Sequence, residues 1–154
     1  MARSRVNVEQ RTETLLRATI VAQLASDSVA GVTHRRFWTS DTDTATESIN
    51  DKTITYKADP NAPRDGEYHS PYRIVPATVT IITSQASDPK RTTLATVYES
   101  VREALDFGSF TDTDMDPVEV MPTPGGSSDV IETDKGWINQ VEIPVQVDVN
   151  YPGS

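Results

Sequence analysis

The chain of 154 residues contains no cysteine and only two histidines, His34 and His69. Without cysteine it can form no disulfide, no thiolate metal site and no thiol nucleophile. The histidines lie far apart in the chain, and neither has the spacing of a metal ligand. No segment approaches the ~20 apolar residues that span a bilayer, and the charged residues 1–5 precede no apolar signal core. We therefore expect a soluble protein without a membrane partner.

Motifs of the common enzyme classes are also missing. The sequence has no G-x-S-x-G nucleophile elbow, no P-loop and no G-x-G-x-x-G motif. The segment Gly125-Gly126-Ser127-Ser128 is compatible with phosphate in isolation, but no lysine follows it and two prolines precede it, which favours a turn. We expect no catalytic residues, no cofactor and no enzymatic activity.

Charge is unevenly distributed along the chain. The formal net charge is −9. Residues 1–36 carry six arginines and three acids, a net of +3, whereas residues 37–154 carry eight cations and 20 acids, a net of −12. Such an acidic body repels phosphate backbones and argues against ordinary duplex binding. The basic segment is either a solvated helix face or one half of a head-to-tail contact between copies.

The last patterned stretch, residues 141–151, is the clearest strand. Every odd residue is apolar or aromatic and every even residue is polar or proline, a period of two with one buried face. Pro144 has no N–H, so the even-numbered side should be unpaired around it, at a sheet edge or a bulge. We expect this edge to lie at a subunit boundary or under a loop.

Two helices and several strands precede it. Residues 8–25 have a helical apolar stripe of Leu16, Ile20 and Leu24, widened by Leu15, Ala18 and Val21, with Arg11, Glu13, Arg17 and Gln23 on the wet side. Residues 53–58 and 74–83 alternate as strands. Asp88 suits a helix N-cap with Pro89 at the first helical position, and the helix should run to Leu105 and end at Gly108.

Loops join these elements. Residues 29–38 are ambiguous, residues 39–51 and 58–72 predict long loops, and residues 111–117 form an acidic loop before short strands at 118–121 and 129–133. Residues 1–7 predict a flexible arm. The whole chain, residues 1–154, predicts a single α+β domain in two layers, with a mixed or antiparallel sheet and two main helices on one face.

One acidic cluster raises the possibility of a metal site. Asp112, Asp114 and Asp116 match the first ligands of an EF-hand loop, but Pro117 replaces its glycine and Thr123 its closing glutamate. A solvated acidic loop is favoured, and we expect no metal site. A small metal-dependent hydrolase using these carboxylates remains the enzymatic alternative.

Arg35, Arg36, Phe37 and Trp38 form the one cluster that joins two cations to two adjacent aromatics. The aromatics could pack in the core with the arginines at the surface. The cluster could instead be a protein interface, where Trp and Arg are enriched. Stacking of single-stranded bases is the third possibility, disfavoured by the acidic body.

The order of these features resembles that of the tail terminator (tail completion) proteins of long-tailed bacteriophages, over roughly residues 8–151. The resemblance lies in the helix at 8–25, the proline-rich loop, the strand at 74–83, the helix at 88–105 and the closing WINQVEIPVQVDVNY strand. It implies a structural protein of the virion tail and neck, assembled in the host cytoplasm. It also implies a homo-oligomeric, hexameric ring that caps the tail tube, stops its polymerisation and joins the head connector, with DNA only passing through its lumen.

The resemblance carries no functional residues with it, because it rests on order and pattern. Another head-tail neck or connector adaptor is the alternative within the same assembly. Interface candidates follow from the cluster, the long loop and the closing strand: Arg35, Arg36, Phe37, Trp38, Arg64, Tyr68 and Pro144.

Overall fold

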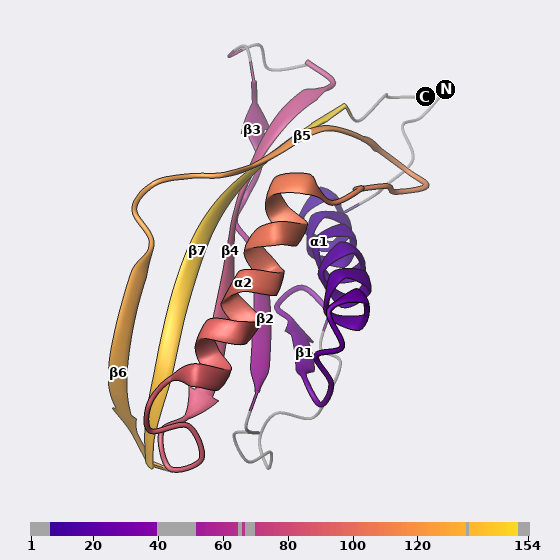
Figure 1. Ribbon diagram of the computed structural model, residues 1–154. Helices are drawn as coiled ribbons and strands as arrows, with labels where there is room; N and C mark the ends of the chain where they lie inside the picture. The colour runs from indigo at the N-terminus through magenta and orange to yellow at the C-terminus, as the bar shows by residue number, and fades with distance from the viewer. Residues whose placement is uncertain (1–6, 40–51, 65, 67–69, 135, 151–154) are drawn as a thin grey trace.

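The computed structural model describes residues 7–39, 52–64, 66, 70–134 and 136–150 as a sheet with two helices on one face (Figure 1). The predicted two-layer α+β class is confirmed. The helices are α1 (Val8–Ser26) and α2 (Thr92–Phe107). The strands are β1 (Thr33–Arg36), β2 (Thr53–Ala58), β3 (Ala62–Pro63), β4 (Tyr72–Ser84), β5 (Asp116–Pro122), β6 (Ser127–Thr133) and β7 (Gly136–Asn150).

The sheet is built around its two longest strands. Its order is β1-β2-β4-β7-β5, with β3 added to β4 and β6 to β7. β4 and β7 pair antiparallel from Tyr72 opposite Asn150 to Ser84 opposite Ile138. β1 and β2 are parallel, and the other pairs are antiparallel, so the sheet is mixed.

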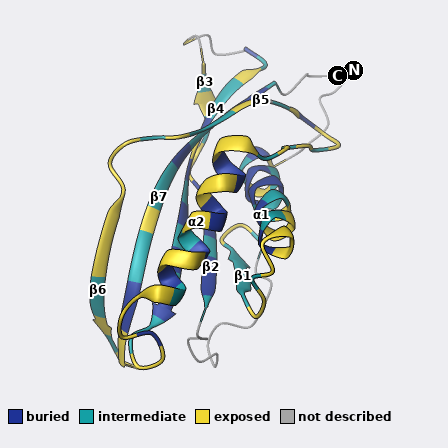
Figure 2. Cartoon of the chain, in the orientation of Figure 1, coloured by how far each residue is buried: buried dark blue, intermediate teal, exposed yellow. Residues whose placement is uncertain are grey.

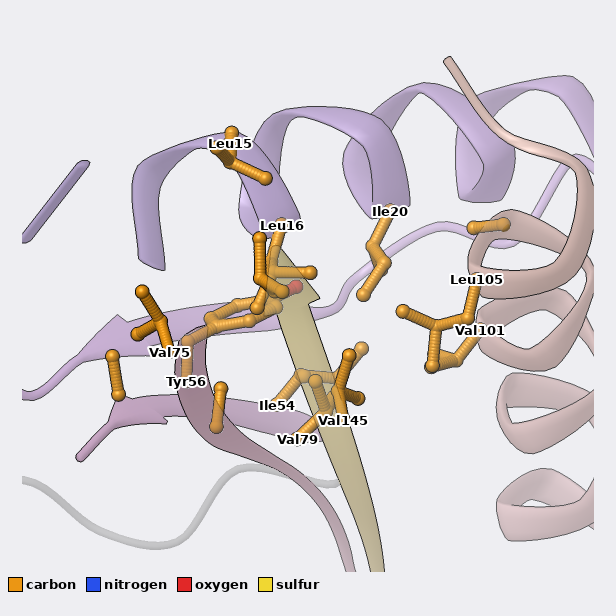
Figure 3. Packing of buried hydrophobic residues seen from close by; sticks show 14 of the residues in the cluster. Leu15, Leu16, Ile20, Ile54, Tyr56, Val75, Val79, Val101, Leu105 and Val145 are labelled. Carbon is orange, nitrogen blue, oxygen red and sulfur yellow. The ribbon is translucent and has the colours of Figure 1, made fainter. Parts of the chain in front are cut away.

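The core lies between this sheet and the helices (Figure 3). Val75, Val79 and Ile81 on β4 and Val145 and Val147 on β7 are buried, as the period of two predicts. From the helices come Leu15, Leu16, Ile20 and Leu24 on α1, and Leu94, Val97, Val101, Ala104 and Leu105 on α2. Figure 2 shows the matching division of α2 into a buried and an exposed side.

The predicted burial of α1 is wrong at three positions. Ala18 and Val21, placed on the apolar stripe, are exposed, whereas Glu13, placed on the wet side, is fully buried. The helix therefore presents a face rotated toward Thr12 and Glu13, both buried. On this face, Glu13 accepts backbone hydrogen bonds from the strand ends beneath it.

The start of α2 is also corrected. The helix begins at Thr92 rather than at Pro89, and residue Arg91 before it has a φ of +58°, in the left-handed region. The Asp88 carboxylate still accepts the first helical N–H groups, from Thr93 at 3.0 Å and Leu94 at 2.9 Å. The predicted capping residue was therefore right, but it acts across an intervening turn. Gly108 follows the helix as predicted.

β7 is not an edge strand, so that prediction is wrong. β4 pairs along one side of it, and β6 and β5 pair with successive halves of the other side. Pro144 falls in the gap between β5 and β6. Residues 123–126 form a bulge there, and the Thr123 N–H donates to the Pro144 carbonyl at 2.8 Å. A Cβ at Gly126 would lie 2.5 Å from the Glu142 carbonyl oxygen, so this bulge packs directly on β7. Of the two alternatives that the sequence allowed for Pro144, a sheet edge or a bulge, the structure therefore shows the bulge.

The predicted loop at residues 58–72 contains regular structure. β3 pairs with Arg73 and Ile74 of β4, and the Arg64 N–H bonds to the Tyr72 carbonyl at 2.9 Å. The short strands predicted at 118–121 and 129–133 are confirmed within β5 and β6. Tyr68, most of the predicted loop at 39–51 and residues 1–6 of the predicted arm lie outside the described residues.

Candidate protein-interaction site

The arginine–aromatic cluster lies at the end of the sheet formed by β1. Phe37 is 58 % exposed and Trp38 is 41 % exposed, and their rings meet edge to face with centroids 5.5 Å apart. The interpretation that either aromatic packs in the core is therefore wrong. These two side chains are called the aromatic pair below.

Four hydrogen bonds, two of them donated by backbone N–H groups, hold the segment that carries this aromatic pair. The Phe37 N–H donates to the Tyr56 carbonyl at 3.0 Å, which continues the β1–β2 ladder. The Trp38 N–H donates to Glu13 Oε1 at 2.8 Å, and its indole Nε1 donates to the Ala58 carbonyl at 2.7 Å. On the following residue, Gln10 on α1 bonds the Thr39 hydroxyl. The backbone of both residues and the Trp38 indole are thus fixed, as in a preorganised contact.

Glu13 is the buried anchor of this arrangement. Its second oxygen accepts the Ala58 N–H at 2.9 Å, so one carboxylate joins the ends of β1 and β2 to α1. Burial raises the pKa of Glu13, and the hydrogen bonds from Ala58, Trp38 and Phe37 and the charge of Arg36 act against that rise. No periodicity in the sequence indicated this role, because an isolated glutamate on a helix is normally solvated.

Cations surround the aromatic pair. The Lys57 ammonium lies 5.1 Å from the centroid of the Phe37 ring, a cation–π contact. The Arg36 guanidinium donates to the Thr14 hydroxyl of α1 at 2.8 Å. β1 and β2 together carry three cations, Arg35, Arg36 and Lys57, and no acid, a net of +3. These two strands are basic although the molecule is acidic, and the Glu13 carboxylate and Asp59 beside them offset part of their charge.

A groove of about 590 Å³ lies at the opposite end of the sheet, between α2 and β7. Leu94 and Leu105 of α2 are buried there, and Tyr98, Val141 and Ile143 are half-buried against the core. Residues 122–128, the end of β5 and the bulge, form its outer wall. It is called the α2–β7 groove below.

Sequence reasoning missed the α2–β7 groove. Val141 and Ile143 fall on the predicted apolar face of the closing strand, and Gly125 to Ser128 were predicted as a turn. The signal that was available is Pro144 with the Pro122-Thr-Pro124-Gly-Gly run, since both interrupt strand pairing. The groove lies where β5 gives way to β6 along β7, beside the bulge of residues 123–126.

The remaining predicted residues lie elsewhere. Arg64 is 3.7 Å from the buried carboxylate of Asp148, so it covers the outer face of β7. Arg11 of α1 forms ion pairs with Asp112 and Asp114, so the acidic loop faces a guanidinium rather than open solvent. Among the described residues, no three acidic or histidine side chains are grouped to hold a metal ion.

His34 stacks on the buried Tyr56, with Nδ1 2.8 Å from its hydroxyl, and burial raises the pKa of that tyrosine. No helix in the described part of the chain is long and apolar enough to cross a membrane.

Fold and surfaces together define a two-layer α+β protein with an exposed aromatic pair at one end of its sheet and an apolar groove at the other. No known family profile matches the chain, and no curated protein does. Among solved structures, the chain is similar to a chain from the virion of a native gene transfer agent particle. The two share 12 % sequence identity with a TM-score of 0.49, over 88 % of this chain and 95 % of that one.

Proposed function

We propose that this chain is a structural virion protein, a tail terminator of the long-tailed phage type, which acts by binding alone. In this role it forms a ring at the end of a tail tube, stops the tube from growing and offers a surface to the head connector. Its partners are other copies of itself, the tail tube protein and connector proteins, and DNA only passes through the ring.

The observation that carries this proposal is the aromatic pair. Phe37 and Trp38 are exposed, yet hydrogen bonds to Glu13, Tyr56 and Ala58 fix the backbone N–H groups of both residues and the Trp38 indole. Trp and Arg dominate the binding energy of protein interfaces, and a rigid side chain loses little entropy on binding. Such a surface favours protein assembly.

Two further features support the assembly role. The order of elements resembles that of tail terminators, and the two-layer α+β fold agrees with what that resemblance implies. The acidic body would let DNA pass a lumen without counterion-releasing contacts.

The proposal is tested with purified protein and purified tail tubes. Light scattering should give the mass of a closed ring, and electron microscopy should show density at the tips of tubes, whose length stops increasing. Trp38→Ala should reduce ring formation at least tenfold, since a hot-spot tryptophan contributes on the order of 2 kcal/mol or more. Ala22→Ser, at an exposed α1 position, is the control. A strict monomer that never binds tube tips would exclude the proposal.

A connector adaptor is the second candidate, because the same surface could serve a neighbouring ring. Pull-down against portal complexes and against tube tips separates the two functions. Binding to tube tips identifies a terminator, whereas binding only to portal complexes identifies an adaptor.

A further inference from the structure

We infer that the α2–β7 groove receives the aromatic pair of a second copy of this chain, so that copies join head to tail. This inference rests on the proposed ring and assigns both halves of its subunit contact. The contact consists of Phe37 and Trp38 on one copy and the Leu94–Tyr98 side of α2 with Val141 and Ile143 of β7 on the next.

The two surfaces lie at opposite ends of the sheet. The aromatic pair follows β1, the first strand in the sheet order, whereas β7 and β6 lie at the other end. Figure 1 shows β1 on the right of the view and β6 on the left, with α2 between them. The pair therefore cannot enter the groove of its own molecule. A contact between two different patches of identical subunits is heterologous, and it closes into a ring when the rotation permits.

The groove matches an aromatic occupant in its lining and size. Its floor is aliphatic at Leu94 and Leu105, and Tyr98 offers a ring to its wall. Its volume of about 590 Å³ lies in the range of pockets that enclose bulky apolar groups. An apolar groove of this kind is where hot-spot aromatics dock, and the edge-to-face rings arrive already ordered.

Charge selects the orientation of the contact. The strands beside the aromatic pair, β1 and β2, carry a net +3. The charged residues that line the groove itself, Arg91, Arg102, Asp106 and Glu142, balance to zero. The elements that flank it, α2 and β6, carry five acids (Glu99, Glu103, Asp106, Asp129 and Glu132) and one cation, Arg102, a net of −4. Opposite potentials across an interface steer encounter and suppress like-to-like pairing. A second copy brings both the aromatic pair and the matching charge.

The absence of cysteine makes a clean cross-linking test possible. Lys57→Cys places a thiol beside the aromatic pair, and Ala95→Cys places one at an exposed position in the groove lining. With a short thiol-reactive cross-linker, the double variant should give a ladder of covalent oligomers that ends at the ring size. Each single variant should give no ladder. In a mixture, the two single variants should give one heterodimer.

Two further variants test the chemistry of the contact. Trp38→Ala in the double-cysteine background should reduce the ladder at least tenfold. Ala95→Arg, assayed without cysteines, should weaken ring formation to a similar degree, because it places in the groove a cation that the basic end of the next copy repels. Position 95 is exposed in the monomer, so circular dichroism and thermal unfolding should match those of the unaltered protein.

The control pair is Ala22→Cys with Ala95→Cys, which uses an exposed α1 position in place of Lys57. A ladder from the control pair but not from the Lys57–Ala95 pair would overturn the inference. A dimer in either single variant alone would also overturn it, because it would show an isologous contact. Rings that form without any Lys57–Ala95 cross-link would overturn this inference and leave the proposed function standing, whereas a strict monomer would remove both.

Discussion

Glu13 shows how one residue can differ from its helical pattern. It lies among polar neighbours on α1, yet it is fully buried and accepts the N–H groups of Trp38 and Ala58. A buried carboxylate is tolerated when its oxygens are hydrogen-bonded, and these donors are backbone groups that would otherwise lack partners. The Glu13 side chain thus links the buried core to the segment that carries the aromatic pair.

Replacing the Glu13 carboxylate should lower the stability of the protein. Glu13→Gln puts an NH₂ group opposite a backbone N–H, so one buried donor loses its acceptor. The expected loss in the free energy of unfolding is about 1–3 kcal/mol, measured by urea denaturation. Glu9→Gln on the same helix is the matched control. Both the backbone N–H and the side-chain amide of Asn61 donate to one Glu9 oxygen, and glutamine keeps that oxygen, so this variant should lose little stability.

The pH dependence of this loss has a definite sign. The pKa of Glu13 is raised above its usual 4.5, so its stabilisation is full below that pH and is lost as pH rises through the folded-state pKa. The deficit of Glu13→Gln relative to the unaltered protein should therefore be largest below pH 4.5 and shrink toward neutral pH. A deficit that grows with rising pH would contradict the role given to burial.

At the scale of elements, the start of α2 depends on Asp88. Its oxygens accept the Thr93 and Leu94 N–H groups and the Thr83 hydroxyl, and the Thr83 oxygen also accepts from the buried Asn139. One carboxylate therefore joins the end of β4, the start of α2 and β7. A local pattern located the residue but not the turn between it and the helix.

Asp88→Asn should destabilise the protein by about 1–2 kcal/mol at neutral pH. Burial acts to raise the pKa of Asp88, but the hydrogen bonds from Leu94, Thr93 and Thr83 outweigh it and hold that pKa below 3.8. The stabilisation is present above pH 3.8 and is lost as pH falls through the lower folded-state value. The deficit of the variant should therefore shrink in acid, opposite to that of Glu13→Gln. Denaturation curves on both sides of pH 3.8 measure it.

At the scale of the whole molecule, the charge division predicts how assembly responds to salt. If the net +3 of β1 and β2 meets the net −4 of α2 and β6, screening should weaken association by several-fold, about one order of magnitude at most, as ionic strength rises from 0.05 to 0.5 M. Sedimentation at several salt concentrations measures this. Glu103→Gln should reduce the salt slope, and Glu119→Gln, at an exposed β5 position outside the groove lining, should not. Association that strengthens with salt would indicate a purely apolar contact.

Local pattern was sufficient for the fold class. The alternation in residues 74–83 and 141–149 and the helical stripe of Leu16, Ile20 and Leu24 predicted which faces are buried, and those faces form the core. These periods follow from the geometry of strand and helix, which each segment carries by itself. The charge division is likewise a property of the sequence alone.

Tertiary structure alone decided which surfaces remained uncovered. It placed β5 and β6 beside β7, which turned the expected edge at Pro144 into a bulge and opened the α2–β7 groove. It also buried Glu13 and left Phe37 and Trp38 in solvent. The sequence determined periodicity, fold class and charge, because these are local or additive. Exposure depends on which distant segment arrives as a neighbour, and only the folded chain specifies that.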